Sequence, residues 1–231
     1  MNRRRHIPKV LGLMFTLALS FFMLLAAGAQ ANWLVGGVEL KVNKGVLAKA
    51  HSALELNVAS HSIEFRCANV SASGVELKAS SAEATGKMVF SGCKAYSPIA
   101  LTGTEQKNCN PVNPIEVGFK ASLLLHNGVN YVLFAPNPST SPFTTIEIGL
   151  FCALAETSDV TGSLVAQCGR LNASSEFEGE NCNVAGVTHL IKPALLALFT
   201  ADSLKFGANG ASFAGIAAVE LSSKESWAGH I

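Results

Sequence analysis

Six cysteines are the residues of this 231-residue sequence best suited to covalent chemistry. An exported chain with an even number of cysteines normally oxidises them to disulfides, and the N-terminal segment described below indicates export. No pair has C-x-x-C spacing, and no cysteine lies near a histidine at zinc-finger spacing. We therefore expect disulfides and no metal site. The disulfide candidates form two triplets, Cys67, Cys93, Cys109 and Cys152, Cys168, Cys182.

The sequences around the cysteines resemble one another. EQKNCN at 105–110 is matched by EGENCN at 178–183, and each follows a Thr-Gly, apolar, Cys run: TGKMVFSGC in the first case and TGSLVAQC in the second. Order and spacing favour an internal duplication, with repeat units at about 60–112 and 145–186, over chance similarity in a β-rich chain. The sequence therefore predicts a pseudo-symmetric domain.

Symmetry also suggests a pairing among the many that six cysteines allow. Equivalent cysteines should pair equivalently within each unit, which joins Cys93 to Cys109 and Cys168 to Cys182. Cys67 then meets Cys152 between the units. The asparagines that flank Cys109 and Cys182 suit the turn at the far end of such a loop, because Asn tolerates left-handed backbone.

The sequence contains no complete catalytic motif. GASFAG at 210–215 has one residue too many for a nucleophile elbow and lies in alternating strand sequence, so Ser212 is read as structural. The histidines after the N-terminal segment show no metal-ligand spacing and are expected at the surface or in loops: His51, His61, His126, His189 and His230. We assign no catalytic, cofactor-binding or metal-binding residue, and no cofactor.

The N-terminus has the order of a secretory signal peptide. MNRRRHIPK is basic, the next nineteen residues are apolar, and AQA precedes Asn32. We expect residues 1–31 to be a signal peptide cleaved after Ala31. The apolar run is long enough that an uncleaved N-terminal membrane anchor is the alternative. In the first case the chain is secreted or extracytoplasmic and has no membrane contact once the signal is removed.

Residues 32–231 carry few charges. Four of the seventeen Lys and Arg lie before residue 32 and none of the sixteen acids do, which leaves thirteen positive and sixteen negative charges. Nothing in this balance favours nucleic acid as a partner. No linker or charge block marks a boundary, so we expect a single domain over 32–231.

Period-two alternation dominates this domain. Apolar residues alternate with polar ones at 54–58, 63–67 and 115–121, as in strands with one buried face. HNGVN at 126–130 is a hairpin signal, and GANGA marks a second hairpin within 201–221. The segment 188–204 fits either a helix or a strand. The fold class is therefore all-β, an antiparallel sandwich or barrel stapled by disulfides.

Several short stretches together resemble a group of exported bacterial cysteine-bearing β-proteins of unknown function: FRCA, TGKMVFSGC, NCN, FTTIEIGLFC, VTGSLVA and AGIAAVELSSKESW, over about residues 60–225. Cys168 and Cys182 are extra to the pattern of that group. The resemblance implies an exported β-fold and no catalytic residue.

These observations predict a non-enzymatic exported β-module, a binding or structural protein of the cell surface or extracellular space. A cell-envelope component or a carbohydrate is the partner considered for it. The alternative is an exported hydrolase whose acidic residues converge only in the folded chain. A concave pocket holding two or more perturbed carboxylates or histidines would favour that alternative.

Overall fold

Antiparallel strands dominate the computed structural model, which describes residues 31–97, 103–149, 151–152, 154, 157–194 and 203–231. The strands are β1 Asn32–Val35, β2 Val38–Glu39, β3 Lys44–Ala50, β4 Leu54–Val58, β5 Ile63–Leu77, β6 Glu83–Ser97, β7 Thr104–Glu105, β8 Ile115–His126, β9 Val129–Pro136, β10 Thr144–Glu147, β11 Thr157–Thr161, β12 Leu164–Leu171, β13 Phe177–Glu180, β14 Thr188–Pro193, β15 Lys205–Phe206, β16 Asn209–Gly210, β17 Ser212–Ala214, β18 Ala217–Leu221 and β19 Trp227–His230. Two short 3₁₀ turns, η1 Ala59–His61 and η2 Lys107–Cys109, lie between them.

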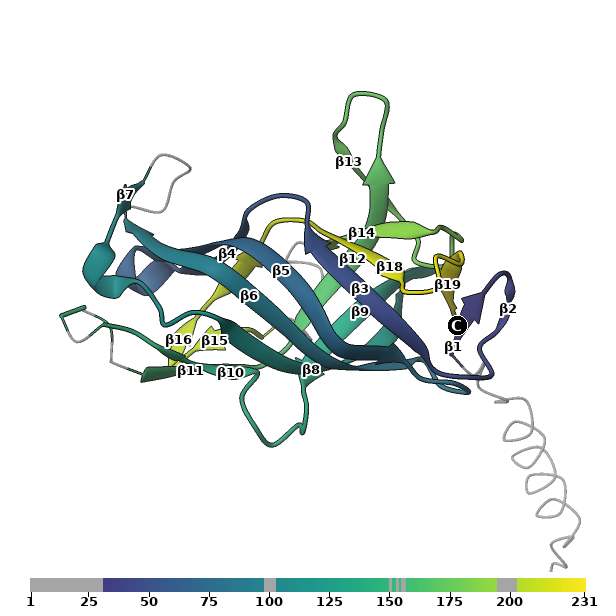
Figure 1. Cartoon of the computed structure of the whole chain (residues 1–231), viewed down its shortest axis with the longest axis horizontal. Coiled ribbons are helices and arrows are strands. Elements are labelled where there is room, and N and C mark those ends of the chain that lie inside the picture. Colours follow the sequence, from purple (N-terminus) through teal and green to yellow (C-terminus); the bar gives the residue numbers. More distant parts are fainter. Residues whose placement is uncertain (1–30, 98–102, 150, 153, 155–156, 195–202) are drawn as a thin grey trace, which may run out of the picture. The chain divides into compact units, whose positions relative to one another are not determined.

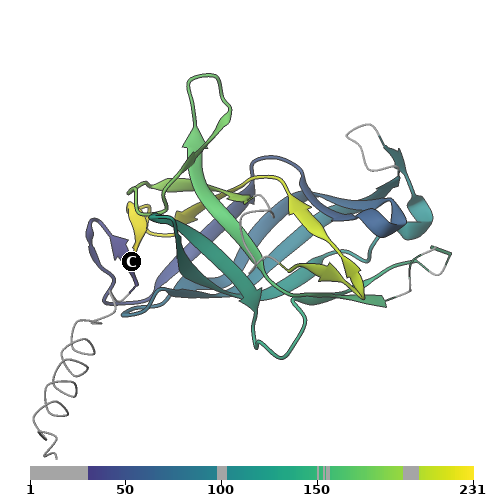
Figure 2. The ribbon, with the colours of Figure 1, turned by 180° about the vertical axis from the view of Figure 1, so that it is seen from behind.

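Eight of these strands close into a barrel. The order is β3, β5, β6, β8, β9, β12, β14 and β18, which pairs back to β3, and every neighbour is antiparallel. β8, β9 and β12 form the wall seen from behind, and the β12–β13 hairpin projects from it (Figure 2). Of the sandwich and the barrel that the sequence allowed, the chain adopts the barrel. A barrel of this size encloses a side-chain core or one small ligand.

The long strands β5 and β6 continue beyond the barrel at one end. There the first residues of β5 pair with β4, and β17 adds to β4. A separate sheet of β10, β11, β15 and β16 lies opposite this extension (Figure 1). Phe206 of that sheet packs on Phe65 of β5, with ring centroids 5.6 Å apart. The two sheets thus face each other across an apolar interior.

A three-stranded sheet of β2, β1 and β19 lies at the other end. It carries Trp33 and Trp227, whose rings meet edge to face with centroids 5.9 Å apart. The indole N–H of Trp33 donates to the backbone oxygen of Glu83, the first residue of β6, at 2.8 Å. This contact fixes the small sheet to the barrel.

Most strand predictions are confirmed, and so is the Asn-Gly hairpin. Asn127 and Gly128 both have positive φ, as a type I′ turn between β8 and β9 requires. The predicted hairpin over 201–221 is shorter than expected, because only β15 and β16 form it and β17 and β18 pair elsewhere. Of the ambiguous segment, 188–193 is the strand β14. Residues 195–202 lie outside the described residues.

The expected signal peptide also falls outside the described part of the chain, since that part begins at residue 31. Within it, no helix has the length and apolar character needed to cross a membrane.

All six cysteines form disulfides, but two of the three predicted pairs are wrong. Cys168–Cys182 is as expected. Cys67 bonds Cys93, not Cys152, because the two residues lie directly opposite in the β5–β6 ladder. Cys109 therefore bonds Cys152, which joins η2 to the turn after β10.

The same pairing removes the argument for internal duplication. Cys67–Cys93 has no counterpart, because Cys152 and Cys168 are not bonded to each other. The proposed units also differ in structure: 60–112 contains the two long strands β5 and β6, whereas 145–186 is divided between the four-stranded sheet and the barrel.

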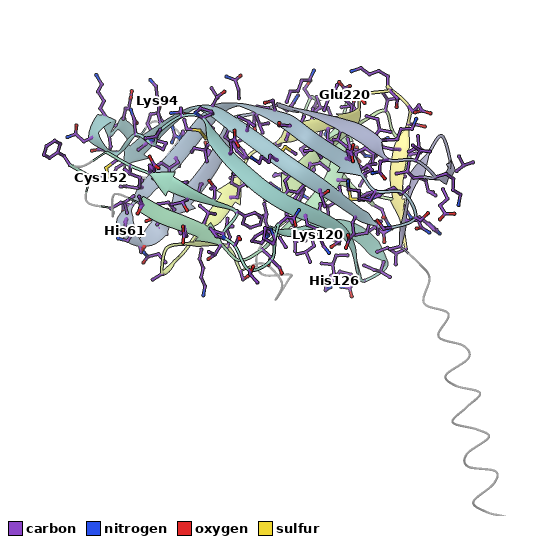
Figure 3. All side chains as sticks on the ribbon, turned by 60° about the horizontal axis from the view of Figure 1, so that its bottom comes forward. His61, Lys94, Lys120, His126, Cys152 and Glu220 are labelled. Atoms are coloured by element: carbon purple, nitrogen blue, oxygen red, sulfur yellow. A yellow bond between two sulfur atoms is a disulfide. The ribbon has the colours of Figure 1, made fainter. Side chains whose placement is uncertain are left out.

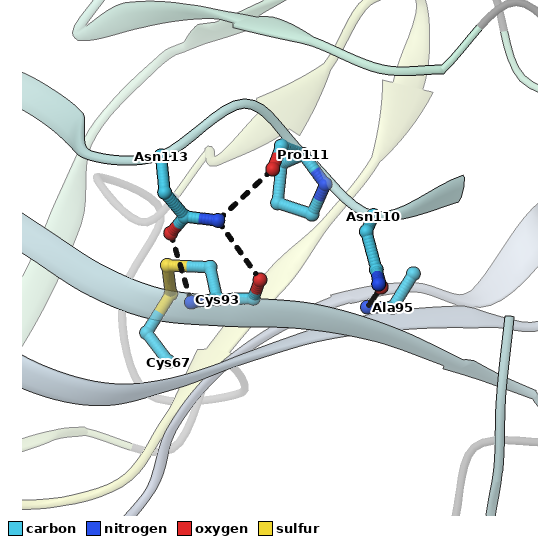
Figure 4. The surroundings of a disulfide bond; sticks show 6 residues. All are labelled: Cys67, Cys93, Ala95, Asn110, Pro111 and Asn113. Carbon is cyan, nitrogen blue, oxygen red and sulfur yellow. Dashed lines mark hydrogen bonds between the residues drawn. A yellow bond between two sulfur atoms is a disulfide. The ribbon is translucent and has the colours of Figure 1, made fainter. Parts of the chain in front are cut away.

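Asn110 of the first Asn-Cys-Asn segment and Asn113, three residues later, bind the edge of β6 (Figure 4). The side-chain oxygen of Asn110 accepts from the backbone N–H of Ala95 at 2.8 Å. The side chain of Asn113 accepts from the N–H of Cys93 at 2.9 Å and donates to its carbonyl oxygen at 3.1 Å. β8 pairs with β6 only up to Phe90, so these asparagines replace the missing strand.

The second Asn-Cys-Asn segment does the same for β9. The side-chain oxygen of Asn181 accepts from the N–H of Asn130 at 3.0 Å, and its amide donates to the carbonyl of Gly128 at 3.2 Å. The N–H of Cys182 donates to the carbonyl of Asn130 at 3.1 Å. The two segments therefore share a function as side-chain caps for strands.

Candidate functional site

An apolar cavity extends from the barrel interior into the space between β4, β10 and β11 beyond the barrel. Alternation along each strand turns one side chain in two toward the interior, as with Phe119 and Ala121 on either side of the outward Lys120 in β8. The volume of this cavity is about 180 Å³. The lining is Leu54, Leu56, Phe65, Cys67, Val70, Met88, Phe90, Ile115, Val117, Phe119, Phe134, Phe143, Thr144, Ile146, Val160, Leu164, Ala166, Ile191, Pro193, Leu204, Phe213, Gly215, Ala217 and Val219.

The burial of these side chains shows that the interior is not close-packed. Met88, Phe90, Val117 and Phe134 point inward, yet they are only half-buried because they border the cavity. Protein interiors normally leave few voids larger than a water molecule. A void of this size between inward-facing side chains therefore calls for a functional explanation.

A smaller void of about 50 Å³ continues toward the three-stranded sheet. It is lined by Trp33 and Trp227 and by small residues of the wall, including Ala84 and Ala121. The two voids share five lining residues, namely Met88, Phe119, Phe134, Ile191 and Val219. Those five side chains form the partition between an outer void and an inner void in one lumen.

The lining of the outer void offers almost no polar chemistry. Among the lining residues that the structure describes, Thr144 alone has a hydroxyl, which lies 3.5 Å from the carbonyl of Thr145. Cys67 is bonded to Cys93, so none of the described lining side chains can titrate. The described lining can therefore recognise a molecule by shape and apolar contact.

Charged residues lie on the outside of the barrel wall. Lys94 and Glu220 point away from the sheet (Figure 3). Lys120 pairs with Glu83 across the outer face of β6 and β8. These ion pairs are solvent-exposed, and such pairs typically contribute little to stability.

One charged cluster is shielded on the outer face of β4 and β5. Glu64 is 2% exposed and pairs with Arg66, whose guanidinium also lies 4.5 Å from the centre of the Tyr96 ring. Burial, reinforced by the like charge of Glu64, raises the pKa of Glu55 above its usual value. Because Phe65 and Cys67 face the lumen, strand alternation places this cluster on the opposite side of the sheet from the cavity.

His189 corrects the expectation that the histidines lie at the surface. It is 3% exposed, and its Nε2 lies 2.8 Å from the carbonyl oxygen of Trp227. Its ring also meets the Trp227 ring edge to face, 4.2 Å between centroids. Burial lowers the pKa of His189, so it is a neutral support for the tryptophan near neutral pH.

The structure places the cysteines and the serine that were singled out from the sequence. The six cysteines staple the wall and loops, and Ser212 lies in β17 as read from the alternation. Within the described ranges, no three His, Cys, Asp or Glu side chains gather where they could hold a metal. Sequence reasoning missed the cavity, although alternation had identified many of its inward-facing side chains.

Comparisons with known proteins give no relative. No family model, no curated protein and no solved structure matches the chain.

Proposed function

We propose that this chain is an exported, non-enzymatic binding protein that takes up a small apolar molecule inside its barrel. The observation that carries the proposal is the lumen of about 180 Å³ lined almost wholly by apolar side chains. Ligand pockets are typically concave and largely apolar with few polar groups. Three disulfides favour an oxidising, extracytoplasmic compartment, which agrees with cleavage of an N-terminal signal.

An apolar molecule fits this lumen better than the partners considered from the sequence. A carbohydrate presents many hydroxyls that must keep hydrogen bonds when buried, and the outer void offers the hydroxyl of Thr144. A hydrolase needs acid and base groups that face its substrate. Glu55, whose pKa is raised, lies on the other side of the sheet.

Calorimetric titration of the chain with toluene tests the proposal. We expect saturable binding of one toluene per chain with a negative heat-capacity change, which is the signature of apolar burial. Ala166→Leu directs three extra carbons into the outer void and should weaken toluene binding at least tenfold. Ala173→Leu makes the same change at an exposed turn of the β12–β13 hairpin and should bind toluene as the wild type does.

Both variants should keep a cooperative thermal transition, because the new side chain of Ala166→Leu enters empty space. Absence of saturable binding to the wild type, or equal toluene affinity in wild type and a folded Ala166→Leu, would contradict the proposal.

A further inference from the structure

Phenylalanine rings gather around the outer void. The chain has thirteen phenylalanines, and six of them line this cavity. They come from β5, β6, β8, β9 and β17 and from the residue before β10. The six are Phe65, Phe90, Phe119, Phe134, Phe143 and Phe213. Aliphatic side chains would exclude water from the wall equally well, so this concentration of rings calls for an explanation beyond burial.

Several of these rings border empty space. Phe90, Phe134 and Phe213 line the void and are only half-buried. Phe90 meets Phe213 edge to face, with centroids 6.0 Å apart, although β6 and β17 are not neighbours in the sheet. Phe119 and Phe134 form a second pair, with centroids 5.5 Å apart and planes inclined by 57°. The sides of these pairs that border the void can receive a further ring.

Such a lining favours an aromatic ring over a saturated one. Aromatic rings prefer offset or edge-to-face contacts with centroids about 4.5–7 Å apart, and each contact adds about two- to tenfold to an affinity beyond area burial. A methionine sulfur is also attracted to a ring edge, and the half-buried Met88 borders the same void. A saturated ring of the same size gains only from apolar burial and packing.

The volume of the outer void limits such a ligand to a single ring. A dry apolar cavity of about 150 Å³ holds one benzene molecule. The outer void, at about 180 Å³, therefore has room for a benzene ring with a small substituent. Among the described lining side chains Thr144 alone has a hydroxyl and none has a charge. A ligand that buried hydroxyl or ionic groups there would lose their hydrogen bonds with water.

We propose that the outer void is selective for monocyclic aromatic hydrocarbons, held edge to face by its phenylalanines, over saturated hydrocarbons of the same size. This inference rests on the proposed function, because it specifies the ligand class of the same lumen. It concerns the choice between two apolar ligands, whereas the proposed function requires only that an apolar ligand binds.

Toluene and methylcyclohexane separate aromatic recognition from apolar burial. They share the same carbon skeleton, and methylcyclohexane has the larger apolar surface, so burial alone would make it the tighter ligand. Both are volatile, and headspace gas chromatography above solutions of the protein gives their free concentrations. The wild type should bind toluene at least about threefold more tightly than methylcyclohexane. Naphthalene, with two fused rings, should bind more weakly than toluene although its apolar surface is larger.

Two substitutions test whether the rings cause the selectivity. Phe213→Leu and Phe134→Leu each remove a ring from a different pair and keep an apolar side chain. Each should lower the ratio of toluene affinity to methylcyclohexane affinity about two- to tenfold. The ratio is compared because the space left by a lost ring is open to both ligands. Phe151→Leu is the matched control, since Phe151 is 86% exposed and lies outside the void, and it should keep the wild-type ratio.

Three results would overturn the inference and leave the proposed function standing. The first is methylcyclohexane binding as tightly as toluene or more tightly, and the second is naphthalene binding more tightly than toluene. The third is a toluene preference that the folded phenylalanine variants keep unchanged. The comparison in the wild type decides the selectivity even where a variant does not fold. If neither toluene nor methylcyclohexane binds, the proposed function fails as well.

Discussion

Two neighbouring side chains, His189 and Trp227, lie at the inner end of the lumen, and His189 holds Trp227 in place. The Nε2 atom of His189 meets the carbonyl of Trp227, and the two rings are in edge contact. Burial lowers the pKa of His189, so the protein holds it neutral where the unfolded chain binds a proton below about pH 6.5. The position of the tryptophan is therefore coupled to proton binding.

This coupling predicts a pH-dependent stability. Below about pH 6.5, His189 binds a proton in the unfolded state but not in the folded state. The free energy of unfolding therefore falls as the pH drops toward the lower folded pKa of His189. Urea unfolding between pH 7.5 and 5 should show this loss, with a slope of at most ~1.4 kcal/mol per pH unit from this group. His189→Gln should flatten the profile in that window.

His61→Gln, at an exposed histidine of η1, is the matched control for that measurement. The same slope in wild type and His189→Gln would show that the buried histidine is not the group responsible.

At the scale of elements, local pattern predicted the strands well and long-range pairing poorly. Asn127 and Gly128 identify the β8–β9 hairpin because the turn needs positive φ at both positions. Alternation correctly placed Phe65 and Cys67 on the buried face of β5. The partner of Cys67 was missed because it depends on which strand lies beside β5, and a single strand's pattern does not contain that information. The cavity was missed for a similar reason. Alternation predicts that Phe134 faces inward, but the same pattern results whether Phe134 contacts another side chain or borders a void.

The disulfides give a prediction at this scale. Cys109–Cys152 joins η2 to the turn after β10, and β10 contributes Thr144 and Ile146 to the lumen. Replacing both cysteines by alanine opens a loop of 43 residues and should lower the free energy of unfolding by about 4 kcal/mol. It should also weaken toluene binding, because the wall that β10 forms is no longer tied down.

Cys168–Cys182 is the control pair, since it closes a loop of 14 residues and neither cysteine lines the outer void. Its double alanine variant should lose about 3 kcal/mol of stability yet bind toluene as the wild type does, once both are compared well below their unfolding temperatures. Equal binding in the two double variants would refute the role assigned to β10.

At the scale of the whole domain, the described residues form a barrel whose two ends are covered by different sheets. The two tryptophans of the three-stranded sheet close one end, and the extended strands β4 to β6 face the four-stranded sheet at the other. A closed barrel leaves few free sheet edges through which chains could associate. The apolar lumen between these ends is a feature that stability does not require, because filling a void usually stabilises a protein.

Diffraction from crystals pressurised with xenon tests the central claim most directly, because xenon enters dry apolar cavities and avoids hydrated ones. The account predicts a strong xenon peak in the outer void, within contact of Phe65, Ile146 and Val160, and no ordered water in the lumen. A lumen filled by ordered water, or closed by side chains so that xenon does not enter, would contradict the account.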